Sequence, residues 1–304
     1  MAFTDYDKCS LLLPMDGANN GTTFEDWSPN PKTVTANGNA KTVTTQSKYY
    51  GSSGYFDGAG DNLQIPANDA FSFGSDDFTI AAWMRLNVSK TTTGNYSGIV
   101  SRDATTLNRG WLLTQQGDSG GKIIFAFRDG TTAYTVSSST IPVVDVWYHI
   151  AAIRYNDTLT LYIAGTGESS LDVTGASVND NPTYDTFVGT ICSSLNSPAA
   201  NFDLNGYLQD LIIINGSALW TSDFTPPPRL IGEISGTVKD KDDNVASRII
   251  TACPRSNPTR AFSTVSSAGD GSYTLIAPAT EVSRIALADE TVLYNDIVDR
   301  IIPE

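Results

Sequence analysis

Residues 54–66 read GYFDGAGDNLQIP, and residues 77–86 read DFTIAAWMRL. The first stretch places a turn of Gly and Asp between two short runs in which apolar and polar residues alternate. Such a turn supplies the positive-φ positions and the side-chain acceptors that a chain reversal needs. The second stretch is a longer apolar run, which is typical of a strand with a buried face. Together the two stretches predict β-structure.

The composition of the whole chain favours an all-β protein. Only 17% of the 304 residues are charged, and Thr, Ser, Asn and Gly are abundant, which suits strands and turns better than solvated helices. We therefore expect little helix. A β-sandwich of roughly 200 to 250 residues can form one domain, so the length leaves room for a smaller second unit.

The net charge is −14 and the isoelectric point is about 4.4. A nucleic-acid site needs clustered Lys and Arg to displace counterions, so we expect no nucleic-acid partner. Anionic membrane surfaces are disfavoured for the same reason. No stretch approaches the ~20 apolar residues of a membrane span, so no membrane insertion is expected. We interpret the acidity as a source of solubility.

The chain contains three cysteines, Cys9, Cys192 and Cys253, and one histidine, His149. They show no C-x-x-C spacing and no histidine partners, so they predict neither a zinc site nor a disulfide framework. A sparse, odd number of cysteines indicates folding in a reducing cytosol. Residues 1–7 lack the basic start and the apolar segment of a secretory signal peptide, so no export signal is expected.

Further blocks of sequence accompany the two opening stretches. They are LLLPMDG at 11–17, TFED at 23–26, WYHIAAIR at 147–154, LTLYIAG at 159–165, GYLQDLIII at 206–214 and FTPP at 224–227. In this order the blocks resemble the concanavalin A-like, laminin-G-type lectin family over about residues 8–230. The front blocks resemble the form found in bacteriophage structural proteins. The resemblance implies a jelly-roll β-sandwich with a central hairpin at 147–165, in a family that consists chiefly of recognition modules.

Three consecutive prolines, Pro226 to Pro228, mark a boundary, because residues without amide donors cannot continue a central strand. We predict a lectin-like domain at residues 1–229 and a small β-domain at 230–304. SGTV at 235–238 and GDGSYTL at 269–275 resemble a carboxypeptidase regulatory-like, immunoglobulin-like sandwich. That resemblance implies a role in spacing and assembly. Strands are expected at 232–240, 247–252, 261–265 and 272–275.

The last fifteen residues carry apolar side chains at positions 293, 294, 297, 298 and 301. This spacing fits one face of a helix, and a terminal strand that completes the sandwich is the alternative. So much apolar surface indicates packing, either within its own domain or onto another subunit.

Catalytic signatures are absent from the sequence. Glucanases of the same broad fold use carboxylates in a Glu-x-Asp-x-Glu pattern, and none of the six glutamates forms it. His149 lies in an apolar run, where we expect a core or half-buried histidine with its hydrogen bonds satisfied. No Gly-rich phosphate loop opens a helix. We therefore predict a protein that is not an enzyme.

A structural calcium ion is the one cofactor that the sequence predicts. Calcium prefers six to eight oxygen ligands, and the turn at 57–62 offers Asp57 and Asp61. Asp16, Asp26 and Asp210 are further oxygen donors that a sandwich could bring together. The alternative is that Asp57 and Asp61 cap their own turn through side-chain hydrogen bonds.

Glycan recognition needs an exposed aromatic ring to stack on the sugar, with polar groups to fix its hydroxyls. Candidates in predicted loops are Trp27, Tyr49, Tyr50, Tyr96, Tyr134, Tyr184 and Trp220. For each of them, packing over the sandwich edge is the alternative. Trp83, Trp147 and Trp111 are expected in the core, because they lie inside apolar strands.

The sequence therefore predicts a non-enzymatic phage virion protein of the tail or capsid, made in the host cytoplasm and released by lysis. The lectin-like domain would bind a cell-surface glycan, and the second domain would attach to other virion proteins. Many copies would offset weak binding at each site, so a homo-oligomer is expected, with a trimer by analogy to phage fibres. The alternatives are a purely structural decoration protein and a bacterial adhesin.

Overall fold

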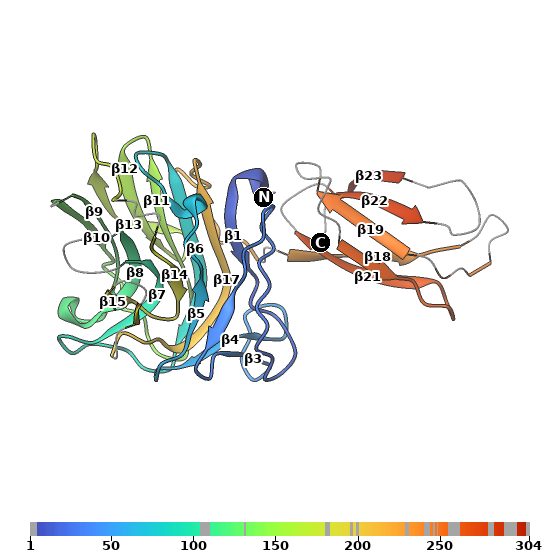
Figure 1. Ribbon diagram of the computed structural model, residues 1–304, viewed down its shortest axis with the longest axis horizontal. Coiled ribbons are helices and arrows are strands. Elements are labelled where there is room, and N and C mark those ends of the chain that lie inside the picture. The colour runs from blue at the N-terminus through green and yellow to red at the C-terminus, as the bar shows by residue number, and fades with distance from the viewer. Residues whose placement is uncertain are drawn as a thin grey trace. The chain divides into compact units, whose positions relative to one another are not determined.

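The computed structural model describes residues 5–103, 110–130, 132–179, 183–194, 197–198, 201–228, 231–239, 244–245, 247, 249–254, 262–278, 283–288 and 297–301. The chain divides into two compact units (Figure 1). One unit is Lys8–Pro226, and the other is Pro227–Glu304 together with Met1–Asp7.

The larger unit is a sandwich of two antiparallel sheets (Figure 1). The eight-stranded sheet has the order β13-β12-β11-β6-β17-β4-β3, with β1 also paired to β17. Its strands are β1 (Cys9–Leu13), β3 (Lys41–Val43), β4 (Ser53–Asp57), β6 (Phe78–Leu86), β11 (Trp147–Tyr155), β12 (Thr158–Ile163), β13 (Thr166–Asp172) and β17 (Asn205–Asn215).

The seven-stranded sheet has the order β10-β9-β8-β7-β14-β5-β2. Its strands are β2 (Thr35–Asn37), β5 (Asn62–Ile65), β7 (Tyr96–Arg102), β8 (Trp111–Gln116), β9 (Lys122–Asp129), β10 (Thr132–Ser137) and β14 (Thr186–Val188). A short pair, β15 (Cys192–Ser194) and β16 (Ser197–Pro198), lies beyond β14 in the chain.

Helix is confined, in the described residues, to three short 3₁₀ turns: η1 (Tyr6–Lys8), η2 (Asp69–Phe71) and η3 (Gly117–Ser119). None of the described helices has the length and apolar character to cross a bilayer. The predicted all-β fold is confirmed.

The two sheets enclose one apolar core, to which alternate residues of each strand contribute. On β6, Ile80, Ala82 and Met84 belong to this core, so Trp83 and Arg85 point to the opposite, outer face of the eight-stranded sheet. Trp111 is fully buried in the core, as predicted. Burying each such large side chain stabilises the fold by about 1.5–3 kcal/mol.

The prediction for the other two tryptophans needs correction. Trp83 is buried but lies outside the inter-sheet core, and Trp147 is only half-buried. Trp147 pairs with Arg85, and His149 pairs with Trp83. Because directly opposite residues share a face, all four side chains lie on the outer face of the sheet. The core prediction for Trp83 and Trp147 was wrong because it was based on their apolar neighbours in sequence, which do not show the face of the sheet on which a side chain lies.

Residues 54–66 contain the end of β4 and all of β5, but these two strands do not pair with each other as a hairpin. β4 pairs with β17 and β3 in one sheet, whereas β5 pairs with β14 and β2 in the other. The Gly/Asp turn therefore carries the chain from one sheet to the other. Gly58 and Gly60 have φ of 84° and 86°, the left-handed conformation that glycine adopts without strain.

Asp61 organises this crossover. It is fully buried, and its Oδ2 accepts a hydrogen bond from the Asp57 amide at 2.7 Å, while Oδ1 accepts one from the Asn39 amide. Burial raises the pKa of the Asp61 carboxyl, against the two amide donors, which lower it. One side chain thus joins the turn to the loop between β2 and β3.

The predicted central hairpin is confirmed. β11 and β12 pair in regular register from Ile150↔Ile163 to Tyr155↔Thr158. The two-residue loop between them, Asn156 and Asp157, has positive φ at both positions, which matches the right-handed twist of the flanking strands.

The smaller unit has two sheets in its described part. β18 (Ile231–Thr237) pairs with β21 (Ser272–Pro278), and the second sheet has the order β20-β19-β22-β23. The strands of the second sheet are β19 (Ile249–Pro254), β20 (Phe262–Val265), β22 (Ser283–Ala288) and β23 (Ile297–Ile301). β23 confirms the strand alternative for that part of the tail, and residues 290–296 lie outside the described residues.

Replacing Asp61 by Ala should destabilise the sandwich by about 2–4 kcal/mol, because the Asp57 and Asn39 amides lose their acceptor at a fully buried position. All five tryptophans lie between positions 27 and 220, so tryptophan fluorescence during urea unfolding reports on the larger unit alone. The control is Asp76→Ala, which removes an exposed carboxylate. Equal unfolding midpoints for the two variants would contradict the role of Asp61.

Candidate functional site

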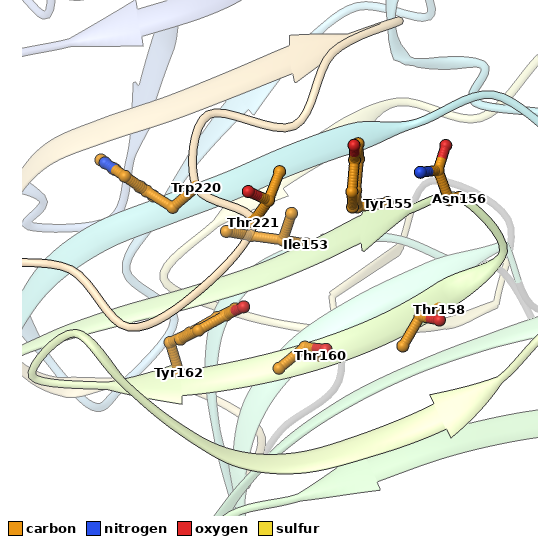
Figure 2. Close-up of a pocket in the computed structure, with 8 residues that line it drawn as sticks. All are labelled: Ile153, Tyr155, Asn156, Thr158, Thr160, Tyr162, Trp220 and Thr221. Atoms are coloured by element: carbon orange, nitrogen blue, oxygen red, sulfur yellow. The ribbon is translucent and has the colours of Figure 1, made fainter.

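A hollow of about 280 Å³ lies on the outer face of the eight-stranded sheet, over β11 and β12. Figure 2 shows the side chains that line it, which are Ile153, Tyr155, Asn156, Thr158, Thr160, Tyr162, Trp220 and Thr221. We call this hollow the groove. It is close to the lower limit of about 300 Å³ for small-molecule pockets, so it suits a ligand of one or a few rings.

The alternation of the central hairpin places most of these residues. On β12, Leu159 and Leu161 belong to the core, so Thr158, Thr160 and Tyr162 point outward. Tyr155 ends β11 and is 42% exposed. Tyr162, Thr160 and Thr158 follow one another along β12, and Tyr155 lies opposite Thr158 (Figure 2). Tyr162 is 5% exposed, so Tyr155 is the hairpin ring that is open to a ligand.

The third ring comes from the segment that follows β17, residues 216–226, and three contacts fasten this segment to the sheet. The Leu219 amide donates to Thr79 Oγ1 at 2.9 Å, the Phe224 amide donates to the Gly165 carbonyl at 2.9 Å, and Asp223 accepts from the Gly167 amide at 2.9 Å. These bonds hold Trp220 and Thr221 over one end of the groove.

Trp220 is also fixed by stacking. Its ring lies parallel to Phe224 at 4.0 Å between centroids, and His149 meets both rings edge-on at 5.6 Å. Tyr162 contacts Phe224 at 5.4 Å. This aromatic packing leaves Trp220 half-buried, so part of its ring is presented to a ligand at little cost in conformational entropy.

His149 is the buried residue on which the rings of this cluster pack. Its burial lowers the pKa of the imidazole to about 3, and its Nδ1 makes no hydrogen bond to any described residue. The prediction of a buried histidine is confirmed, but the expectation that its hydrogen bonds are satisfied is wrong for Nδ1. The cause is its apolar, aromatic surroundings.

The described residues that line the groove contribute amide, hydroxyl, aliphatic and aromatic groups and no carboxylate, lysine or arginine. Such a surface can stack on an apolar ring face and donate to or accept from hydroxyl groups. It offers no pair of carboxylates for general acid and base catalysis. The chemistry of the groove is therefore that of binding a neutral, hydroxyl-rich ligand.

Of the predicted sugar-stacking residues, only Trp220 lines the groove. Tyr184 is 4% exposed and is removed from the candidates, because its ring is covered. Tyr134 lies on β10 rather than in a loop and stacks on Phe127. Tyr96 packs edge-on against Phe202.

Three predicted aromatic residues lie elsewhere on the sandwich. Trp27 is half-buried beside β1, where its amide donates to the Leu12 carbonyl. Tyr49 and Tyr50 lie in the loop between β3 and β4, with Tyr49 37% exposed. These positions do not meet Trp220 at the groove.

Tyr155, Tyr162 and the two threonines of β12 were missed as site residues. The sequence contains the signal that could have identified them, because polar or aromatic residues recur at 158, 160 and 162 between core leucines. The outward-facing residues of this hairpin were not considered as a site, because sugar-stacking candidates were sought only in predicted loops.

The five acidic residues predicted as calcium ligands are not brought together. Within the described ranges, no group of three or more His, Cys, Asp or Glu residues could hold a metal ion. Asp26 is buried and accepts from the Leu12, Ser28 and Lys32 amides, and Asp210 accepts from the Tyr50 hydroxyl. Asp16 is half-buried beside β1.

Asp57 and Asp61 cap the crossover turn, as the alternative interpretation expected. Asp57 Oδ1 accepts from the Ala59 amide at 2.9 Å and Oδ2 from Asn39 Nδ2 at 3.2 Å. Both oxygens of Asp61 also accept from backbone amides. Because these oxygens already have donors, a calcium ion does not fit here without breaking the turn.

Calcium should therefore leave the thermal unfolding of the chelator-treated protein unchanged. A site saturated a hundredfold above its Kd would add about 2.7 kcal/mol and raise the midpoint by roughly 5 °C or more. The measurement is tryptophan fluorescence during heating, with calcium, with magnesium and with chelator. A rise specific to calcium would contradict this expectation and support the calcium site that the sequence predicts.

Acid should weaken the sandwich through His149. The unfolded chain binds a proton below the ordinary histidine pKa of 6.5, whereas the folded state does not until about pH 3. The free energy of unfolding should therefore fall by about 1.4 kcal/mol per pH unit as the pH drops from about 6. The measurement is urea unfolding followed by tryptophan fluorescence.

The chain has no other histidine, so the window between pH 6.5 and pH 5 isolates this group from the carboxylates. The control is His149→Phe, which keeps an aromatic ring in the cluster and should lose the dependence. The same slope in both proteins would contradict a buried, neutral His149.

Comparison with known proteins agrees with this architecture. The model of the concanavalin A-like lectin/glucanases superfamily matches residues 57–219. A search of curated protein sequences finds no match.

Several solved structures have a similar fold. The binding domain of Paraclostridial Mosquitocidal Protein 1 is 12% identical with a TM-score of 0.55, and the alignment covers 97% of this chain and 76% of that one. The receptor binding domain of botulinum neurotoxin C/D mosaic serotype is 12% identical with a TM-score of 0.51, over 96% of this chain and 73% of that one. The binding domain of botulinum neurotoxin DC in complex with SialylT is 12% identical with a TM-score of 0.50, over 95% and 74%.

At 12% identity these structures show a shared fold. The family model extends over more than half of the 304 residues, and its match contains the crossover turn, the central hairpin and β17. The resemblance to lectin-like sandwiches is thereby confirmed: the chain belongs to the concanavalin A-like lectin/glucanase superfamily.

Proposed function

We propose that the sandwich is a non-enzymatic carbohydrate-binding module and that the groove takes a neutral sugar. One observation carries the proposal: the exposed ring of Tyr155, the half-buried ring of Trp220, an amide and several hydroxyl groups line a hollow whose described lining carries no charged side chain. A sugar ring has an apolar face for stacking and a rim of hydroxyl groups, which match these two kinds of surface.

The binding of a sugar here does not require the sheet to move. The hairpin turn and the fastened segment at 216–226 place the groups before the ligand arrives, and such preorganisation lowers the cost of binding. The solved structures with a similar fold include binding domains of toxins, one of them in complex with SialylT. This likeness supports a recognition role for the fold and leaves the identity of the sugar to experiment.

The wider role that we propose is that of a phage virion protein, in the tail or the capsid. The support is the resemblance of residues 11–26 to the front strand of bacteriophage structural proteins. In this proposal the larger unit binds a cell-surface glycan, while the immunoglobulin-like smaller unit attaches to other virion proteins. Several copies in a homo-oligomer would raise the avidity of a weak site.

The groove is tested by screening the full chain on an array of neutral glycans and lipopolysaccharides. The strongest binder is then titrated against Tyr155→Ala and Asn156→Gly. Loss of the exposed ring should weaken binding roughly 3- to 10-fold. Gly at position 156 keeps the positive φ of the turn and removes only the side-chain amide.

The matched control is Tyr134→Ala, which removes a ring from the seven-stranded sheet and should leave the affinity unchanged. Equal effects of Tyr134→Ala and Tyr155→Ala would contradict the groove as the binding site. If the folded wild-type chain binds no glycan on the array, the result would instead favour a purely structural decoration protein.

A further inference from the structure

A row of five side chains crosses the outer face of the eight-stranded sheet, away from the groove. The strand registers pair Lys41 with Tyr55, Tyr55 with Tyr207, Tyr207 with Arg85, and Arg85 with Trp147. Directly opposite residues share a face, so β3, β4, β17, β6 and β11 each add one residue. We call this arrangement the Tyr207 row. It spans roughly 19 Å at the usual spacing between strands.

The rings of the Tyr207 row contact one another. Tyr55 and Tyr207 have centroids 5.1 Å apart, and Trp147 lies 6.4 Å from Tyr207. The Arg85 guanidinium is 5.3 Å from the Tyr207 centroid. All five residues are half-buried, so the row presents ring surface that nothing else in the sandwich fully covers.

A fixed ammonium group lies beside the row. Lys48 Nζ is 4.4 Å from the ring centroid of Trp83 and 5.5 Å from that of Tyr49. Trp83 is two residues from Arg85 on the same face of β6. The buried Gln209 holds the loop in place, because its Oε1 accepts from the Lys48 and Tyr49 amides at 2.7 Å and 3.2 Å. Among the described residues Lys48 forms no salt bridge.

Arg85 already pairs with a carboxylate. Its guanidinium binds the Asp145 carboxylate at 2.8 Å, and the Asp145 side chain is 67% exposed. The Arg85 side chain itself is 12% exposed. Because Asp145 is largely solvated, a carboxylate from outside can take its place on the guanidinium.

We propose that the Tyr207 row, together with Lys48, is a second binding site, for a saccharide that carries carboxylate groups. The sugar rings lie against Tyr55, Tyr207 and Trp147, and the carboxylates pair with Lys48 and Arg85. The net charge of the chain is −14, yet Lys41, Lys48 and Arg85 gather on this face. The near end of the groove, Trp220, is separated from Trp83 by the ring of His149. The far end, Tyr155, is eight residues, roughly 26 Å, beyond Trp147 along β11, so a change at Tyr155 tests the groove alone.

Three acidic side chains lie near the Tyr207 row and would repel a ligand that carries carboxylates. Asp57 lies two residues beyond Tyr55 and accepts from Asn39 and Ala59, and Asp210 accepts from the Tyr50 hydroxyl. Asp145 is the one that competes with the ligand, since it lies directly on Arg85.

The test is calorimetric titration of the full chain with an oligogalacturonate and with its methyl ester, which has the same backbone without the charge. The wild type should bind the acid at least tenfold more tightly than the ester. Lys48→Gln should weaken binding of the acid roughly tenfold. Asp145→Asn should strengthen it several-fold, and Asn tolerates the φ of 65° at this position.

The matched control is Lys122→Gln on β9 of the other sheet, which should bind as the wild type does. Absence of binding to the oligogalacturonate, equal affinity for acid and ester, or equal behaviour of Lys48→Gln and Lys122→Gln would each overturn the proposal. Tyr155→Ala should bind the oligogalacturonate normally, so failure at this site and failure at the groove are distinguishable.

Discussion

The pairing of β17 is the constraint on which the outer face of the sandwich depends. β17 lies against β6 along one edge, while its other edge is shared by β4, before Asp210, and β1, after it. Asp210 has a positive φ and marks the irregular register between Gln209 and Ile212. This bulge shifts the alternation by one residue, so that Leu208 and Leu211 both reach the core.

The bulge also explains how the groove and the Tyr207 row, the two binding surfaces that we propose, arise on one sheet. Before the bulge, Tyr207 and Gln209 point outward. Tyr207 belongs to the Tyr207 row, and Gln209 fastens the loop that carries Lys48. After it, the chain leaves β17 into the segment at 216–226, which brings Trp220 over the central hairpin. One end of the face is aromatic and cationic, whereas the other is aromatic and uncharged. The two surfaces therefore suit ligands of different charge.

Several buried carboxylates in this acidic chain serve as acceptors for backbone amides. Asp26, Asp61 and Asp203 are buried, and each accepts from amides that are distant in sequence or belong to a turn. Amides bound to a carboxylate form stronger hydrogen bonds than neutral pairs do. The irregular segments between strands are thus fastened from within, and this role accounts for Asp26, Asp57 and Asp61, three of the residues that the sequence offered as metal ligands.

Much of the fold could be predicted from the sequence, because alternation and turn residues act over a few neighbouring positions. The strands β4, β5 and β6 and the strands β18 to β21 of the smaller unit follow from such local patterns, and the resemblance to lectin-like sandwiches added β11, β12 and β17. The strand β22 (Ser283–Ala288) was not predicted. Trp220 was the only residue of the groove found from the sequence. Which sheet β5 joins, which face Trp147 occupies and which rings meet at Tyr207 were decided by the tertiary structure alone. The physical reason is that register and the bulge at Asp210 are set by pairing between residues up to about two hundred positions apart, where local sequence carries no information about the partner.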